Sequence, residues 1–144
     1  MTERLFVYGT LRRGSRHPWA AKLAASATCL GEARYNGRLY RITHYPGVVP
    51  STQPDEWAYG DVFELRDPEI LTALDAYEGC GPDDAEPTQY LRKLQKMTLA
   101  DGTVVEAWMY VYNWSLENRE RIKSGRFDEV DRKSGSAGMP RPIS

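Results

Sequence analysis

Residues 89–113 read QYLRKLQKMTLADGTVVEAWMYVYN, and their pattern decides the class of fold. The runs 89–99 and 103–113 are strand-like, and β-branched and aromatic residues are concentrated in the second. Between them lies an Asp-Gly dipeptide at 101–102, which is typical of a tight hairpin turn. The stretch therefore predicts two antiparallel strands that are neighbours in a sheet.

A second hairpin is predicted over residues 29–42, where an Asn-Gly dipeptide at 36–37 gives the same turn signal. The apolar runs 5–8 and 59–65 predict further strands. Residues 44–50 are predicted to form a loop, because two prolines cannot share a central strand. Strands thus outnumber helices, which favours a largely antiparallel sheet or small barrel over a doubly wound fold.

Helical segments are also indicated. Pro18 stands where a helix would begin, followed by the Ala-rich stretch 19–27. A second helix opens at 67–69 with an N-cap acid, a first-turn proline and a further acid near the positive end of the helix dipole, and Gly79 ends it. A short third helical stretch is predicted over 116–123.

The chain has the size of one domain. Its 144 residues are 41% hydrophobic, which suffices for one packed core, and a second core would be undersized. We expect one domain over residues 1–130 and a disordered tail over 131–144. The acidic, proline-containing segment 80–88 is predicted to be a mobile surface loop.

Composition argues against several classes of function. The 19 basic and 20 acidic residues give a net charge of −1, whereas nucleic-acid proteins carry a basic excess. No run approaches the ~18 apolar residues of a membrane span, and no apolar signal segment opens the chain. Cys29 and Cys80 make no disulfide framework, and no Cys/His cluster has zinc spacing. We therefore expect a cytoplasmic protein with reduced thiols and no structural metal. We also expect a monomer, since no heptad or long apolar face appears.

A carboxylate on the second helix is the best chemical clue. Ile70, Leu71 and Leu74 share one apolar face, and Glu78 follows Leu74 by four residues, so it projects from that face. Burial and the negative end of a helix both raise a carboxyl pKa, which suits a general base near neutral pH. The alternative is that the Glu78 side chain turns out to solvent. Asp75 points elsewhere and is predicted to be a structural or solvated acid.

The turn after the first strand reads YGTLRRG over residues 8–14. Such a turn can leave backbone N–H groups converging on a carboxylate or oxyanion. Ser15 stands where a phosphate-binding loop would have lysine, so that interpretation is rejected. Thr10 either donates a hydrogen bond to a ligand or caps the turn. No Gly-x-Ser-x-Gly elbow occurs and no histidine is suitably placed, which argues against a Ser/His or Cys/His enzyme.

Three segments in this order, 8–14, 45–50 and 74–79, resemble the γ-glutamylcyclotransferase-like family, which includes γ-glutamylamine cyclotransferases and AIG2-like proteins. The resemblance extends over about residues 4–128. It implies an α+β fold, namely a small mixed, largely antiparallel β-barrel flanked by a few helices. It also implies conversion of γ-glutamyl amides to 5-oxoproline and a free amine, without cofactor or metal.

The resemblance also assigns roles to residues. Glu78 is expected to be the acid/base, and Arg92 is expected to neutralise nearby acids without touching substrate. Tyr8, Gly9, Thr10 and Leu11 are expected to hold the γ-glutamyl moiety of the substrate through backbone groups. Two further candidates for lining the substrate site are Tyr90 and Tyr112. For the last two, a role as core aromatics on strands is an equally good interpretation.

Other functions remain open on the sequence. The same site could remove a γ-glutamyl group from a biosynthetic intermediate or act on an ε-(γ-glutamyl)lysine crosslink. A small-molecule binding protein without turnover, or a pure interaction protein, would be a different class altogether. The amine leaving group is not predicted.

Overall fold

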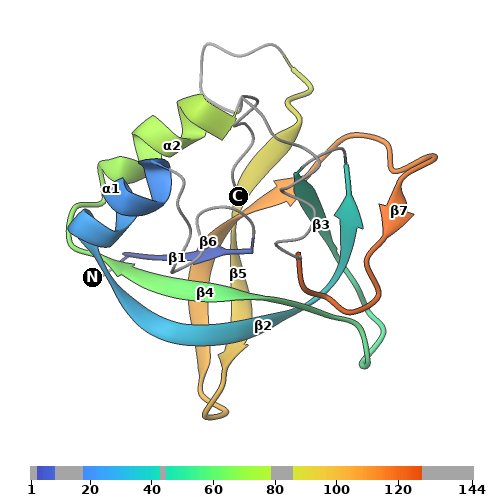
Figure 1. Ribbon diagram of the computed structural model, residues 1–144, viewed down its shortest axis with the longest axis horizontal. Coiled ribbons are helices and arrows are strands. Elements are labelled where there is room, and N and C mark those ends of the chain that lie inside the picture. The colour runs from blue at the N-terminus through green and yellow to red at the C-terminus, as the bar shows by residue number, and fades with distance from the viewer. Residues whose placement is uncertain (1–2, 9–17, 43–44, 79–85, 128–144) are drawn as a thin grey trace.

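The computed structural model describes residues 3–8, 18–42, 45–78 and 86–127 (Figure 1). The strands are β1 Glu3–Val7, β2 Ala27–Arg41, β3 Pro46–Pro50, β4 Trp57–Leu65, β5 Tyr90–Leu99, β6 Val104–Tyr112 and β7 Glu120–Arg121; the helices are α1 Pro18–Ser26 and α2 Ile70–Glu78.

Among the described residues, five strands close a barrel in the order β1-β4-β2-β5-β6 and back to β1. β1 runs parallel to β6, and the other neighbours in the ring are antiparallel. β3 and β7 are extra strands that pair with β2. This mixed, largely antiparallel barrel confirms the predicted fold class.

β2 corrects the prediction of a hairpin over 29–42, because it is one continuous strand. Its first part pairs with β4 and its second part with β3, and the change of partner falls at Asn36 and Gly37. The Asn36 amide donates to the carbonyl oxygens of Gln53 (2.7 Å) and Glu56 (2.8 Å). A Cβ on Gly37 would lie 2.7 Å from the Val49 carbonyl oxygen. The dipeptide therefore allows the backbone of β3 to approach β2 closely, and β2 continues where a turn was predicted.

The loop predicted over 44–50 is also wrong, because residues 46–50 form β3. Its prolines, Pro46 and Pro50, occupy the two ends of the strand, and β3 lies at the edge of the strand order. Proline is excluded from central strands but is accepted at an edge, where a missing N–H costs nothing.

The helical stretch predicted over 116–123 is wrong as well. Asn118 has a left-handed backbone with φ of 66°, which interrupts a helix. The chain then forms the short strand β7, and the Ile122 amide donates to the Leu39 carbonyl oxygen at 2.7 Å. Pairing with β2 therefore replaces the local helical hydrogen bonds.

The hairpin at 89–113 forms as predicted, from β5 and β6. Its turn is stabilised by Asp101, whose carboxylate accepts a hydrogen bond from the Thr103 amide at 2.9 Å. Gly102 supplies the required left-handed backbone, with φ of 93°. The contacts that stabilise this turn are local in the sequence.

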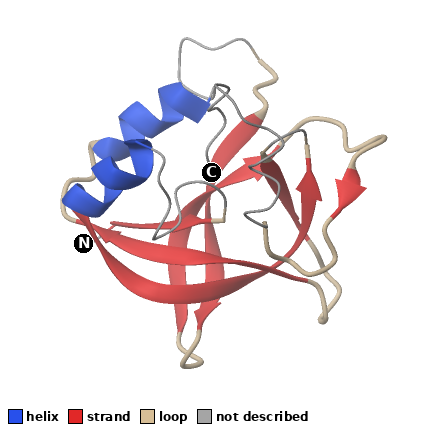
Figure 2. Ribbon diagram, viewed as in Figure 1, coloured by secondary structure: helices blue, strands red, loops and turns tan. Residues whose placement is uncertain are grey.

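Both helices lie on the same side of the barrel (Figure 2). α1 begins at Pro18 as predicted. α2 begins at Ile70, slightly later than predicted, with the Asp67 carboxylate accepting a hydrogen bond from the Glu69 amide at 3.1 Å. No helix among the described residues has the length and apolar character needed to cross a bilayer.

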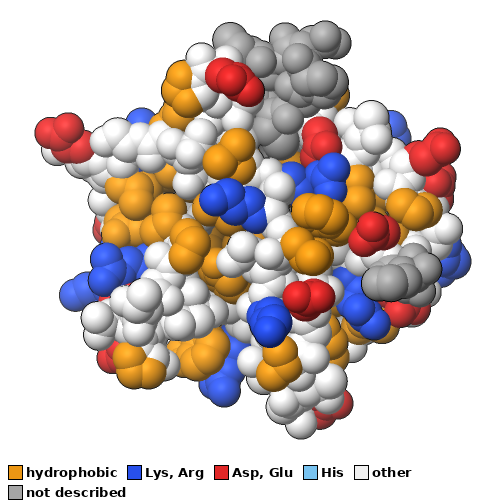
Figure 3. Space-filling model, turned by 180° about the vertical axis from the view of Figure 1, so that it is seen from behind, with side chains coloured by type: hydrophobic (Ala, Val, Ile, Leu, Met, Phe, Trp, Pro, Cys, Tyr) orange, Lys and Arg blue, Asp and Glu red, His pale blue; other side chains and the backbone are white. Residues whose placement is uncertain are grey.

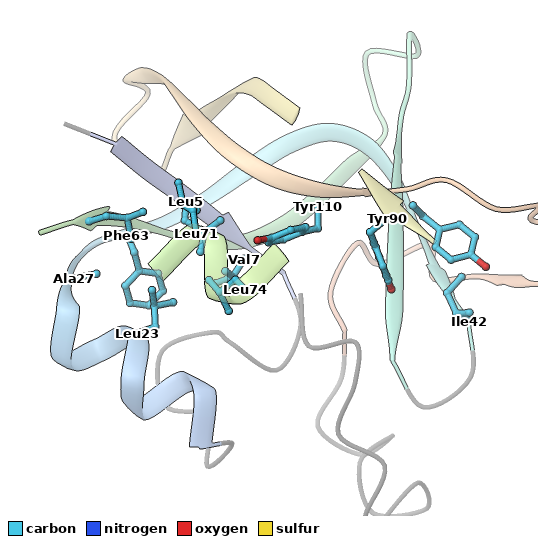
Figure 4. Close-up of a cluster of buried hydrophobic side chains, with 12 residues drawn as sticks. Leu5, Val7, Leu23, Ala27, Ile42, Phe63, Leu71, Leu74, Tyr90 and Tyr110 are labelled. Carbon is cyan, nitrogen blue, oxygen red and sulfur yellow. The ribbon is translucent and has the colours of Figure 1, made fainter. Parts of the chain in front are cut away.

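The core has two parts, and the first strand separates them. Phe6 and Tyr8 point into the barrel, whereas Leu5 and Val7 point toward the helices. The cluster between barrel and helices also contains side chains from α1 and α2: Leu23, Leu71 and Leu74 (Figure 4). The four consecutive side chains of residues 5–8 are fully buried, which explains the continuous apolar run predicted as a buried strand.

The predicted mobile loop, at its residues 80–85, and the predicted tail 131–144 lie outside the described residues. The loop's last residue, Thr88, is buried, and its hydroxyl donates to the Tyr90 carbonyl oxygen at 2.7 Å. On the face shown in Figure 3, basic and acidic side chains are interspersed among hydrophobic ones.

One cluster predicts a pH effect on stability. The Glu56 carboxylate accepts hydrogen bonds from the Ser51 hydroxyl and from Arg38, and Arg121 lies 3.2 Å away. These contacts, the Ser51 hydrogen bond first, lower the pKa of Glu56. A lowered pKa stabilises the fold above the unfolded-state pKa, and the gain disappears as the pH falls through the folded-state value.

Glu56→Gln should therefore be less stable than wild type at neutral pH, and the difference should shrink in acid. Denaturant unfolding at pH 7 and pH 3 measures both. A stability difference that is the same at both pH values would contradict this role for the charge.

Candidate active site

Helix α2 ends at Glu78, so the predicted acid/base is the last residue of the helix. The predicted apolar face is confirmed: Leu71 and Leu74 are buried and Ile70 is half-buried. Outside the described residues lie the side chain of Glu78 and three of the predicted substrate-binding residues, Gly9, Thr10 and Leu11. The contacts of neighbouring described side chains show how α2 is held on the barrel.

Tyr8 is the last described residue before the predicted turn, and its side chain is fully buried. Its hydroxyl donates to the backbone carbonyl of Tyr110 at 2.5 Å. The Tyr8 side chain thus belongs to the barrel interior. Its predicted contact with substrate, through the backbone, stays a prediction.

Tyr110 joins β1 to α2. Its carbonyl accepts the hydrogen bond from Tyr8, and its own hydroxyl donates to Asp75 Oδ1 at 2.8 Å. Figure 4 shows the Tyr110 ring beside Val7 and Leu74, with its hydroxyl pointing toward the helix. Tyr110, through its backbone carbonyl and its side-chain hydroxyl, therefore ties the residue that follows β1 to the last turn of α2.

Asp75 is a structural acid, one of the two roles predicted for it. Arg92 Nε donates to Asp75 Oδ1 at 2.7 Å, and its Nη2 donates to Oδ2 at 3.0 Å. Such a two-point contact pairs the two charges and also fixes the orientation of the two side chains. Arg92 neutralises a nearby acid, as predicted.

Tyr90 and Tyr112 pack edge to face, with ring centroids 5.6 Å apart and planes at 77°. The Tyr90 hydroxyl donates to the Pro46 carbonyl oxygen at 2.6 Å. A Cβ on Gly47 would lie 2.8 Å from the Tyr112 ring, so only glycine fits there. Both tyrosines are core aromatics, in the same cluster as Leu74. Their role in lining the substrate site stays a prediction.

Comparison with known proteins identifies the chain. Residues 5–129 match the family described as "Gamma-glutamyl cyclotransferase, AIG2-like". The chain belongs to this family. A γ-glutamylcyclotransferase family protein of Escherichia coli K12, YtfP, is 34% identical over 132 residues, which are 90% of this chain and 97% of YtfP. A putative γ-glutamylcyclotransferase of Drosophila melanogaster is 31% identical over 77% of this chain and 70% of its own.

Solved structures agree with this membership. The solution structure of ytfP from Escherichia coli has a TM-score of 0.60 at 31% identity, covering 90% of this chain and 99% of that one. A mouse AIG2-like protein has a TM-score of 0.64 at 22% identity and 81% coverage of each chain, which supports the fold alone. The resemblance of the three sequence segments to the γ-glutamylcyclotransferase-like family is confirmed.

A pocket of about 260 Å³ lies at another part of the surface, where β2 meets β5. Its lining includes Glu32, Arg34, Tyr59 and Thr98. None of the predicted site residues lines it, so it is separate from the candidate active site.

Sequence reasoning missed Tyr110. The residue is two positions before Tyr112 on β6, and alternation along a strand places both on the same face. That periodicity was the available signal. The contact with Asp75 could not be predicted, because it depends on how α2 lies across the barrel.

Proposed function

We propose that the protein is a cyclotransferase that closes the γ-glutamyl moiety of a γ-glutamyl amide to 5-oxoproline and releases the amine. The observation that carries this proposal is the tie between β1 and α2 through Tyr110. It joins the strand that precedes residues 9–11, for which the sequence predicts a turn, to the helix that ends at Glu78. Membership of the family supports the class of reaction.

The chemistry needs one base and a held substrate. A γ-glutamyl α-amine is protonated at neutral pH, so a base must remove a proton before the nitrogen can attack the γ-carbonyl. Glu78 takes that proton in this scheme. The new C–N bond closes a five-membered ring within one molecule, so positioning supplies much of the acceleration.

Collapse of the intermediate completes the reaction. In this scheme the backbone N–H groups of residues 9–11, for which a turn is predicted, meet the oxyanion. Glu78 gives the proton to the leaving nitrogen as the bond from the carbonyl carbon to that nitrogen breaks. The ring nitrogen still carries one proton too many, and this proton passes to the released amine, which departs as an ammonium ion. The acyl group moves within one molecule, so this scheme uses no redox partner or second substrate. All of its groups come from one chain, and we propose that the monomer is the active form.

The test is release of 5-oxoproline from a panel of γ-glutamyl dipeptides, γ-glutamylamines and ε-(γ-glutamyl)lysine. We expect release from at least one class, and the preferred amide names the amine. The N-acetyl derivative of the same substrate is the matched control, because it has no free amine to attack and should stay intact. Cleavage of the blocked substrate, or no release from any amide, would overturn the proposal.

A further inference from the structure

Asp75 stands in an unfavourable place for helix stability. It lies in the last turn of α2, which contains no basic residue and also carries Glu78. The C-terminal end of a helix dipole is negative, so acids in the last turn destabilise the helix. The contacts that Asp75 makes must offset this cost.

The contacts of Asp75 are directional. Arg92 contacts both carboxylate oxygens, and Tyr110 donates to one of them as well. The two charged side chains are largely buried, at 17% exposed for Asp75 and 24% for Arg92. Desolvation offsets much of the attraction in such a pair, so its main product is defined geometry and not stability. We call Asp75, Arg92 and Tyr110 the Asp75 clamp.

The clamp is itself fixed to the barrel. The Arg92 guanidinium lies over the Trp108 ring, 4.6 Å from its centroid. The Trp108 indole donates to Glu3 Oε2 at 3.0 Å, at the start of β1. At the other end, the Tyr8 hydroxyl reaches the Tyr110 carbonyl. The clamp thus connects α2 to both ends of β1.

The apolar contacts of α2 define its orientation less sharply than the clamp does. Leu71 and Leu74 hold the helix on the barrel, but hydrophobic contact is non-directional. Small rotations of the helix would preserve it. The clamp opposes such rotation in the turn that carries Glu78.

We propose that Asp75 is a positioning residue, which through Arg92 and Tyr110 fixes the last turn of α2, the turn from which the proposed acid/base Glu78 extends. This inference rests on the proposed function. Asp75 touches no substrate in it.

Asp75→Asn tests the inference by kinetics. We expect kcat to fall roughly tenfold to 100-fold, as for a misplaced catalytic group, while KM changes by less than about threefold because binding contacts remain. The matched control is Glu32→Gln. Glu32 pairs with Arg126 at 2.7 Å, and that arginine also lies over an aromatic ring, Tyr59. Its loss should leave kcat within about twofold of wild type.

Two further variants guard against misfolding of the first. Tyr110→Phe removes one hydroxyl and should also lower kcat at unchanged KM. Arg92→Lys keeps the positive charge but loses the two-point contact, so we expect it to remain impaired. Wild-type kcat in Arg92→Lys would overturn the inference, whatever the kcat of Tyr110→Phe.

Amide hydrogen exchange provides a measure that does not need activity. In Asp75→Asn, exchange in the last turn of α2, residues 75–78, should be faster than in wild type, and in Glu32→Gln it should be unchanged. Equal losses of kcat in Asp75→Asn and Glu32→Gln, or unchanged exchange in Asp75→Asn, would contradict a positioning role for Asp75.

The two proposals can fail separately. If Glu78→Gln is inactive while Asp75→Asn has wild-type kcat, the clamp fails and the function stands. If wild type releases no 5-oxoproline, the proposed function fails, and with it the inference as stated, while exchange still measures whether the clamp orders the helix.

Discussion

Glu78→Gln is expected to lower the turnover of γ-glutamyl amides by roughly 10²–10⁴-fold while the protein still folds. Glutamine has the size and shape of glutamate but cannot accept the proton of the α-amine. Glu78 ends α2, after the residues that pack the helix on the barrel, so the core is untouched. Measuring kcat together with the thermal midpoint separates chemistry from folding.

Glu69→Gln is the control for this variant. Glu69 is an exposed acid just before the same helix, far along it from Glu78. We expect it to retain wild-type kcat. Turnover by Glu78→Gln equal to that of this control would exclude Glu78 as the base.

Gly60→Ala is expected to destabilise the fold strongly, although it adds only one methyl group. Gly60 lies on β4, and a Cβ there would be 2.1 Å from the Val7 carbonyl oxygen and 2.9 Å from the Phe6 ring. Backbone cannot yield as a flexible side chain can, so β4 and β1 must separate locally. We expect a loss of about 3 kcal/mol in the free energy of unfolding, measured with denaturant.

Gly102→Ala is the matched control. Its φ of 93° strains any other residue, but no atom lies within 4 Å of the added Cβ. The expected loss is about 1 kcal/mol, from backbone conformation alone. A smaller loss for Gly60→Ala than for Gly102→Ala would contradict the packing of β4 on β1.

The two dipeptides with hairpin signals show where sequence reasoning succeeds and where it fails. Asp101-Gly102 forms the predicted turn because its stabilising contacts are local, including the one to Thr103. At Asn36 the same kind of side chain binds Gln53 and Glu56, which are distant in sequence. A local pattern cannot reveal that a remote loop will occupy its hydrogen-bonding groups.

The other misjudged elements have the same origin. The prolines of β3 are compatible with a strand only because β3 lies at an edge, and strand order is a property of the whole fold. The segment predicted as a helix over 116–123 is instead held beside β2 through Leu39. Long-range pairing outweighs local propensity in both cases.

For the candidate site, sequence reasoning placed Glu78 at the end of a helix that does form, and paired Arg92 with an acid. Periodicity sufficed for the first, and the second was predicted only in general terms, as neutralisation of nearby acids. Tyr110 was missed because its importance depends on two contacts, to Tyr8 and Asp75, made across the fold.

The most direct test of the account is cleavage of a preferred γ-glutamyl amide in water labelled with oxygen-18, followed by mass spectrometry of the acyl product. Attack by the substrate's own amine predicts 5-oxoproline that carries no label. Glutamate carrying one labelled oxygen would show that water attacks the carbonyl, and would contradict cyclisation.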